Sequence, residues 1–150
     1  MPSSYTASLR FEKQFTGENV NVWGDKLNTL FDRADAAIAG LTTIALTGNY
    51  ALAISNGGGD EARSAMLKFT GGAGPFVVTL PAISKSYKVW NAASGAITLT
   101  TGAGPTVQLD PSDVVEVFCD GAGLRTLGFG GLSLKDHIAS VVVGGGATLP

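Results

Sequence analysis

The sequence predicts a mainly β protein, in which an extended N-terminal arm and one α-helix precede a β-sandwich or jelly-roll-like domain of about nine short strands. Three observations support this fold class. After Gly40 the apolar residues alternate with a period of two, and turn signals recur about every ten residues. Between Val20 and Ile38 the apolar residues recur at steps of three and four, the period of a helix. Glycine is abundant, at 21 of 150 residues, which suits a chain with many turns.

The composition favours a chain whose surface is partly hidden by partners or by copies of itself. Its 150 residues suffice for one domain, or for a small domain with appendages. They are 45% hydrophobic and 15% charged, whereas an average soluble domain is ~25% charged. The alternative is a glycine-rich β-protein with many turns.

The charge balance and the N-terminus argue against several kinds of partner. Nucleic-acid binding requires a basic stripe, but the net charge is −2 and the basic residues are scattered singly. No run reaches the ~18 apolar residues of a membrane span, and Met1–Ser4 lack the segments of a signal peptide. We therefore expect synthesis in the cytoplasm without a signal peptide, no nucleic-acid partner and no membrane insertion.

Residues 1–19 are predicted to be an attachment arm with at most one turn of helix, ordered by docking on another protein. The arm carries large apolar side chains, whereas a solvated tail is more polar; the alternative is a frayed terminus. Aromatic side chains can act as desolvated anchors, and Arg10 offers a fork of donors to a partner's carboxylate. The predicted docking residues are Tyr5, Leu9, Arg10, Phe11, Phe15 and Trp23.

Residues 20–40 are predicted to form a helix over about 20–39 that ends at Gly40, where a C′ glycine is expected. The apolar spacing approaches that of a coiled coil, although it covers only about two and a half heptads. We expect the helix to associate with copies of itself, and the alternative is an amphipathic helix packed on its own domain. The predicted seam consists of Leu27, Leu30, Ala34 and Ile38.

Residues 41–128 are predicted to form the β-domain, and 129–150 a glycine-rich tail that either pairs with another chain's edge or is disordered. Turn dipeptides such as Gly48-Asn49, Ser94-Gly95 and Asp120-Gly121 separate the strands. The predicted strands are 42–47, 50–54, 65–70, 76–80, 86–91, 96–100, 106–109, 114–119 and 124–127.

The sequence offers little catalytic chemistry. It has one histidine, His137 in the tail, and one cysteine, Cys119, which we interpret as a core residue. The acidic pairs at Asp60-Glu61 and 110–113 lie in turns, where they form local backbone bonds. The glycine loops at 71–74 and 102–104 lack the Gly-Lys-Ser/Thr of a phosphate loop, and no nucleophile elbow occurs. We predict that the chain is not an enzyme and needs no metal or cofactor.

Four aromatic residues leave a carbohydrate-contact hypothesis open, provided that they reach the surface together. Aromatic residues at alternate strand positions are more often part of a core. The four are Tyr50, Tyr87, Trp90 and Phe129.

Several short motifs resemble the opening of small tail-fibre-like virion proteins of tailed bacteriophages. They are Pro2–Thr6, Leu9-Arg10, Gly17–Asn19, Trp23–Asn28 and Ala37–Gly40. Later segments resemble the same proteins, so the resemblance covers roughly residues 2–127; these segments are Asn49-Tyr50, Asp60–Arg63, Val89–Asn91 and Phe118–Gly121.

This resemblance implies a non-enzymatic structural component of a virion, commonly trimeric, whose N-terminal part anchors to the particle. The longer distal region usual in such proteins is missing, which favours a short tail fibre or fibre-adaptor protein over a receptor-binding fibre. Its partners would be copies of itself and other virion proteins of the tail or head. The alternatives are a capsid decoration or head-fibre protein, and a carbohydrate-binding module that contacts host surface glycan.

Overall fold

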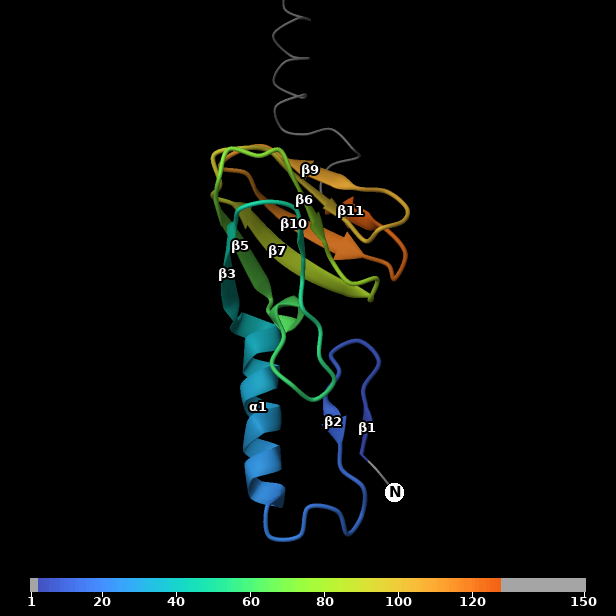
Figure 1. The fold of residues 1–150 in the computed structure, drawn as a ribbon. Coiled ribbons are helices and arrows are strands. Elements are labelled where there is room, and N and C mark those ends of the chain that lie inside the picture. The colour runs from blue at the N-terminus through green and yellow to red at the C-terminus, as the bar shows by residue number, and fades with distance from the viewer. Residues whose placement is uncertain (1–2, 128–150) are drawn as a thin grey trace, which may run out of the picture.

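A computed structural model describes residues 3–127, whereas 1–2 and 128–150 lie outside the description. The predicted tail, with Phe129 and His137, therefore falls outside it. Residues 3–127 form a mainly β fold, as predicted, with one α-helix, one short 3-10 helix (η1, Glu61–Arg63) and eleven short strands in three sheets. Two regions lie end to end (Figure 1): the head, residues 41–127, holds the two larger sheets, and the stem, residues 3–40, holds the helix and the N-terminal arm.

The head contains all nine strands that the sequence predicts, each within three residues of its predicted bounds. The five-stranded sheet has the order β11-β10-β7-β5-β3. Its strands are β3 (Leu41–Leu46), β5 (Met66–Gly71), β7 (Lys85–Asn91), β10 (Val114–Cys119) and β11 (Leu124–Thr126). The four-stranded sheet, in the order β4-β6-β8-β9, contains β4 (Tyr50–Ala51), β6 (Phe76–Thr79), β8 (Ile97–Thr100) and β9 (Val107–Leu109).

From β3 to β8 the chain alternates between the two sheets. Each excursion to the other sheet returns the chain in its original direction, so β3, β5 and β7 pair in parallel, as do β4, β6 and β8. Antiparallel pairs follow at β8–β9, β7–β10 and β10–β11. A jelly roll consists of antiparallel strands, so this mixed pairing differs from the jelly-roll-like arrangement that the sequence predicted, and the sheets do not close into a barrel.

The head core lies between the two sheets. Phe69, Tyr87 and Val89 of the five-stranded sheet face Ile97 and Leu99 of the four-stranded sheet, and each is at most 1% exposed. The alternating apolar residues of the sequence are therefore the inward-facing ones. Cys119 is buried in the same core, as predicted.

Helix α1 (Trp23–Ala39) begins three residues later than predicted. Asn19 and Asn21 adopt φ values of 57° and 69°, and residues in this left-handed region cannot belong to an α-helix. The helix ends at Gly40, but φ there is −67°, so left-handed backbone is not the reason for the glycine. A Cβ on Gly40 would lie 2.6 Å from the carbonyl oxygen of Ala36, which identifies close approach as the requirement.

The N-terminal arm folds back on its own chain, whereas the sequence predicted an arm ordered only by another protein. Strands β1 (Ser4–Tyr5) and β2 (Glu12–Lys13) pair as a short antiparallel ribbon beside α1 (Figure 1). The Oγ atom of Ser3 lies 2.8 Å from a carboxylate oxygen of Glu12 and 2.8 Å from one of Glu18. Strands of two residues have too little alternation to be recognised in a sequence.

Candidate interaction surface

The apolar stripe of helix α1 is largely exposed to solvent. None of the described α1 residues, Trp23–Ala39, is buried. Trp23, Phe31 and Ile38 are 64%, 60% and 80% exposed, and their spacing of eight and seven places them on one helix face. We call Phe31 and Ile38 the open flank of α1. A 17-residue amphipathic helix normally owes its stability to burial of such a face.

The arm covers the other flank of the apolar stripe. A cavity of about 260 Å³ separates the arm from α1. The Nζ atom of Lys26 lies 3.4 Å from Oε2 of Glu12 at this contact. The cavity is lined by Glu12, Gln14, Glu18, Trp23, Lys26, Leu27 and Leu30.

The predicted seam therefore divides into two parts. Leu27 and Leu30 are half-buried against the arm of their own chain, and Ala34 is half-buried as well, whereas Ile38 is exposed. Phe31, which the seam prediction omitted, is exposed beside Ile38. The prediction followed only the alternating steps of three and four, which pass over Phe31. Phe31 lies four residues after Leu27, and this spacing indicates that the two share a helix face.

A buried ionic cluster ties the arm to the head. The guanidinium of Arg10 donates from Nε and Nη2 to both carboxylate oxygens of Asp60, at 2.8–3.1 Å. Arg63 places its Nη2 atom 2.9 Å from the same carboxylate. The Asp60 side chain is 0% exposed, and those of Arg10 and Arg63 are 8% and 2% exposed. Charge-assisted bidentate pairs of this kind are geometrically specific.

Backbone contacts complete the cluster. Nε of Arg63 donates to the carbonyl of Leu9 at 2.9 Å, and the amide of Gly57 donates to the carbonyl of Arg10 at 3.2 Å. Arg10 itself has left-handed backbone, with φ of 56°, a conformation that persists only where surrounding contacts enforce it. Because the guanidinium is engaged within its own chain, its predicted role as a donor to a partner's carboxylate does not fit this placement.

Lys85 extends the cationic cluster. Its Nζ atom donates to the carbonyls of Ala62, Arg63 and Ser64 at 2.6–3.0 Å. Burial, with a smaller contribution from Arg10, lowers the pKa of Lys85 to about 8. Burial likewise lowers the pKa of Arg63 and raises that of Tyr87. At the centre of the cluster, Asp60 pairs with Arg10, 50 residues away, as well as with Arg63. The sequence predicted only local turn bonds for this carboxylate.

The other predicted docking residues differ in accessibility. Tyr5 and Phe15 are 38% and 45% exposed, and Trp23 more so. Leu9 and Phe11 are half-buried within the arm. Tyr5, Phe15 and Trp23 thus remain available to a partner.

The structure describes three of the four aromatic residues of the carbohydrate hypothesis and does not bring those three together. Tyr87 is buried in the core, and the hydroxyl of Tyr50, on the other sheet, donates to Glu61 at 2.8 Å. Trp90 is partly exposed on β7, where Nζ of Lys68 lies 4.0 Å from its ring centroid. Phe129 is outside the described residues.

Residues 3–127 contain neither a metal-binding cluster nor a candidate membrane-spanning helix. Across residues 3–127, no group of three or more potential ligands gathers in a metal-binding arrangement. In the same part of the chain, no helix has the length and apolar character that a membrane span requires. The backbone amide of Asp110 donates to Asp113 at 2.8 Å, the local turn bond expected there.

Comparisons with protein-family models, with curated proteins and with solved structures gave no match to this chain.

Proposed function

We propose that this chain is a homotrimeric structural component of a tailed-phage virion, a short tail fibre or fibre-adaptor protein. The observation that carries the proposal is the open flank of α1, where Phe31 and Ile38 are left in solvent. Burying a large apolar side chain contributes about 1.5–3 kcal/mol. Association through this flank would provide that burial, and the sequence resemblance suggests three copies.

In this proposal the head is a β-sandwich and a spacer. Its two larger sheets share one hydrophobic core, and we interpret the pair as a sandwich. The head therefore does not depend on the stem for its apolar burial. The stem supplies the association, and the low charged fraction of 15% agrees with surface buried between copies.

The arm would anchor the trimer to another virion protein. The exposed aromatic residues Tyr5 and Trp23 are the anchors that support this step, because aromatic side chains dominate the binding energy of many interfaces. Arg10 contributes indirectly, by holding the arm against the head through Asp60. A contact on the tail of the particle would favour a fibre or adaptor. A contact on the phage capsid would favour a decoration protein.

Two charge substitutions test the association. Phe31→Glu combined with Ile38→Glu would place two carboxylates on the open flank, so we expect size-exclusion chromatography to show monomers at concentrations where the wild type is trimeric. The matched control is Val114→Glu, which introduces a charge at a 70% exposed valine of the head and should leave the trimer intact. Trimers of the double variant would contradict a seam at this flank.

Particle incorporation tests the virion role. We expect an infecting phage that encodes the Tyr5→Ala, Trp23→Ala double variant to produce particles lacking the protein, whereas Val20→Ala, at another exposed stem residue, should be incorporated normally. Quantitative mass spectrometry of purified particles measures both. If wild-type protein is absent from purified particles, the virion proposal is wrong; imaging of labelled particles separates tail from head.

A further inference from the structure

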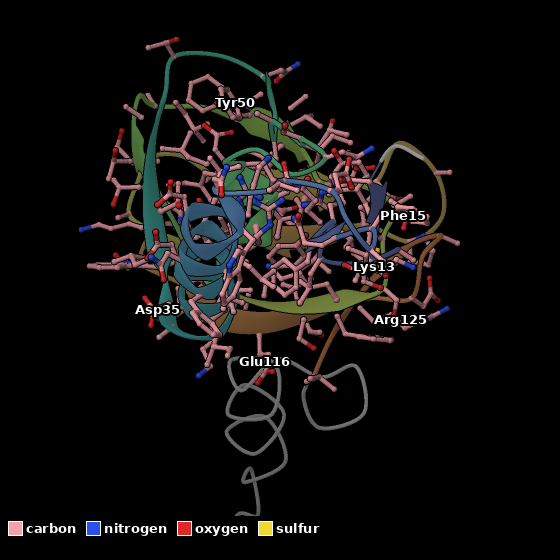
Figure 2. The ribbon with its side chains drawn as sticks, turned by 90° about the horizontal axis from the view of Figure 1, so that it is seen from below. Lys13, Phe15, Asp35, Tyr50, Glu116 and Arg125 are labelled. Carbon is pink, nitrogen blue, oxygen red and sulfur yellow. The ribbon has the colours of Figure 1, made fainter. Side chains whose placement is uncertain are left out.

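The two sides of the stem differ in charge and composition. Figure 2, viewed along the stem, shows Asp35 of α1 on one side and Lys13 and Phe15 of the arm on the opposite side. A subunit with unlike sides can join its neighbour through unlike surfaces, which is the requirement for a head-to-tail ring.

The first side is acidic and apolar. Asp25, Asp32 and Asp35 are exposed on α1, and within residues 3–127 no ion pair engages any of them. Asp35 follows Phe31 by four residues and precedes Ile38 by three, so the acidic side borders the open flank. An apolar strip with a charged border has the anatomy of a protein interface.

The second side is basic and aromatic. Lys13 and Phe15 are both exposed on the arm, and in residues 3–127 no ion pair includes Lys13. Arg125 points outward from the head on this same side (Figure 2), where its Nε atom lies 3.7 Å from Oδ2 of Asp120. This side therefore offers positive charge and an aromatic ring opposite to the carboxylates and the phenylalanine of the first.

The two sides also lie at the same level of the molecule. The arm and α1 line one cavity, from Glu12 and Gln14 on one side to Lys26 and Leu30 on the other, and Figure 1 shows the ribbon β1–β2 alongside α1, below the head. In a ring of parallel copies the arm of each copy therefore meets the helix of its neighbour.

We propose that the acidic side and open flank of α1 in one copy pack against Lys13 and Phe15 of the next copy, so that the copies close head to tail into a ring. This inference rests on the proposed self-association and names its contact. Opposite charges across the interface fix the partner surface and direction of assembly. It assigns Phe15 to the contact between copies and leaves Tyr5 and Trp23 for the particle.

Charge reversal with rescue tests the contact. Sedimentation equilibrium first establishes self-association of the wild type; a monomer there overturns the proposed function and this inference together. Given an oligomer, Asp32→Lys/Asp35→Lys and Lys13→Glu should each weaken association about tenfold or more. Combining all three changes should restore it to within about threefold, since the charges are exchanged. Glu116→Lys, at an exposed carboxylate of the head, is the control and should leave association unchanged.

A wild-type oligomer that the reversals leave unchanged, or that weakens without rescue, overturns this inference alone. Cross-linking gives a second measurement that does not depend on affinity. Lys13→Cys protein mixed with Asp35→Cys protein under a mild oxidant should form a mixed disulfide, because the native Cys119 is buried. The pair Lys13→Cys with Glu116→Cys is the matched control. Equal cross-linking of the two pairs contradicts a head-to-tail ring.

Discussion

The head buries most of its large apolar side chains, whereas the helix of the stem leaves its own largely exposed. In the head, Leu67, Phe69, Val89, Ile97 and Leu99 are all 0% exposed and fill one core between two sheets. In the stem, the 17 residues of α1 include no buried side chain. The head has the core of an independently folded domain, whereas the open flank of α1 is left uncovered by the other residues of 3–127. This difference in burial is the basis of our proposal that the stem associates copies of the chain.

The connection between the two regions is polar. Asp60 is shared by Arg10 of the arm and Arg63 of η1. Each side chain in this cluster depends on the others, because an unpaired buried charge is costly. The arm is therefore held in one geometry even though its apolar contact with α1 leaves a cavity.

The largest expected effect on stability comes from comparing the same substitution at one phenylalanine of the head and one of the stem. Phe69→Ala leaves a cavity in the head core and should lower the free energy of unfolding by about 3–5 kcal/mol. Phe31→Ala, at a 60% exposed position of the stem, should change the stability of the monomer by less than about 0.5 kcal/mol. Urea denaturation monitored by circular dichroism measures both. If both variants lose the same free energy of unfolding in dilute monomer, the proposed difference in burial between head and stem is wrong.

The next effect concerns the ionic connection. Asp60→Asn removes the carboxylate between two buried guanidinium groups and should cost about 3 kcal/mol. Asp35→Asn, an exposed carboxylate without an ion pair among the described residues, is the control and should leave the denaturation midpoint unchanged. We also expect limited proteolysis to cut the arm of the Asp60 variant first. An unaltered midpoint for Asp60→Asn would show that the cluster does not hold the arm.

Two glycines of the stem should respond in opposite directions to the same substitution. Gly40→Ala would bring a Cβ to 2.6 Å from the carbonyl oxygen of Ala36 and should destabilise the protein by about 1–3 kcal/mol. Gly24→Ala meets nothing within 4 Å and should stabilise α1 by about 0.5–1 kcal/mol. Thermal denaturation compares the two. A stable Gly40→Ala variant would mean that the junction of stem and head adjusts without strain.

The last expected effect is a pH dependence of stability. The pKa of Lys85 is about 8 in the folded chain and about 10.4 when unfolded, so between these values the unfolded state binds more protons. Stability should therefore rise as the pH increases from about 8 towards 10. Lys85→Met should abolish this rise, as measured by urea midpoints at each pH. A wild type whose stability falls over this interval while Lys85→Met does not would contradict the lowered pKa.

The sequence predicted the head better than the stem. The strands β5, β7, β8 and β9 alternate between buried and more exposed residues and end near a turn signal, so the pattern identifies them by itself. The parallel pairing of β3, β5 and β7 was missed, because alternation shows which face is buried but not which strand lies alongside.

The stem was predicted less well because its structure depends on distant contacts. Arg10 and Asp60 are 50 residues apart, and nothing near either residue in the sequence indicates that they pair. The ribbon β1–β2 was missed because strands of two residues show too little alternation to be recognised in a sequence. A helical wheel would have placed Phe31 on the apolar face of α1. The helix begins later than predicted because Asn19 and Asn21 adopt left-handed backbone.

We propose that the stem associates copies of this chain. Native mass spectrometry of the purified wild-type protein at micromolar concentration tests it most directly. We expect a species of three chains of 15.3 kDa each, which Phe31→Glu combined with Ile38→Glu should convert to single chains. A wild type that remains a single 15.3 kDa chain at these concentrations would contradict the account.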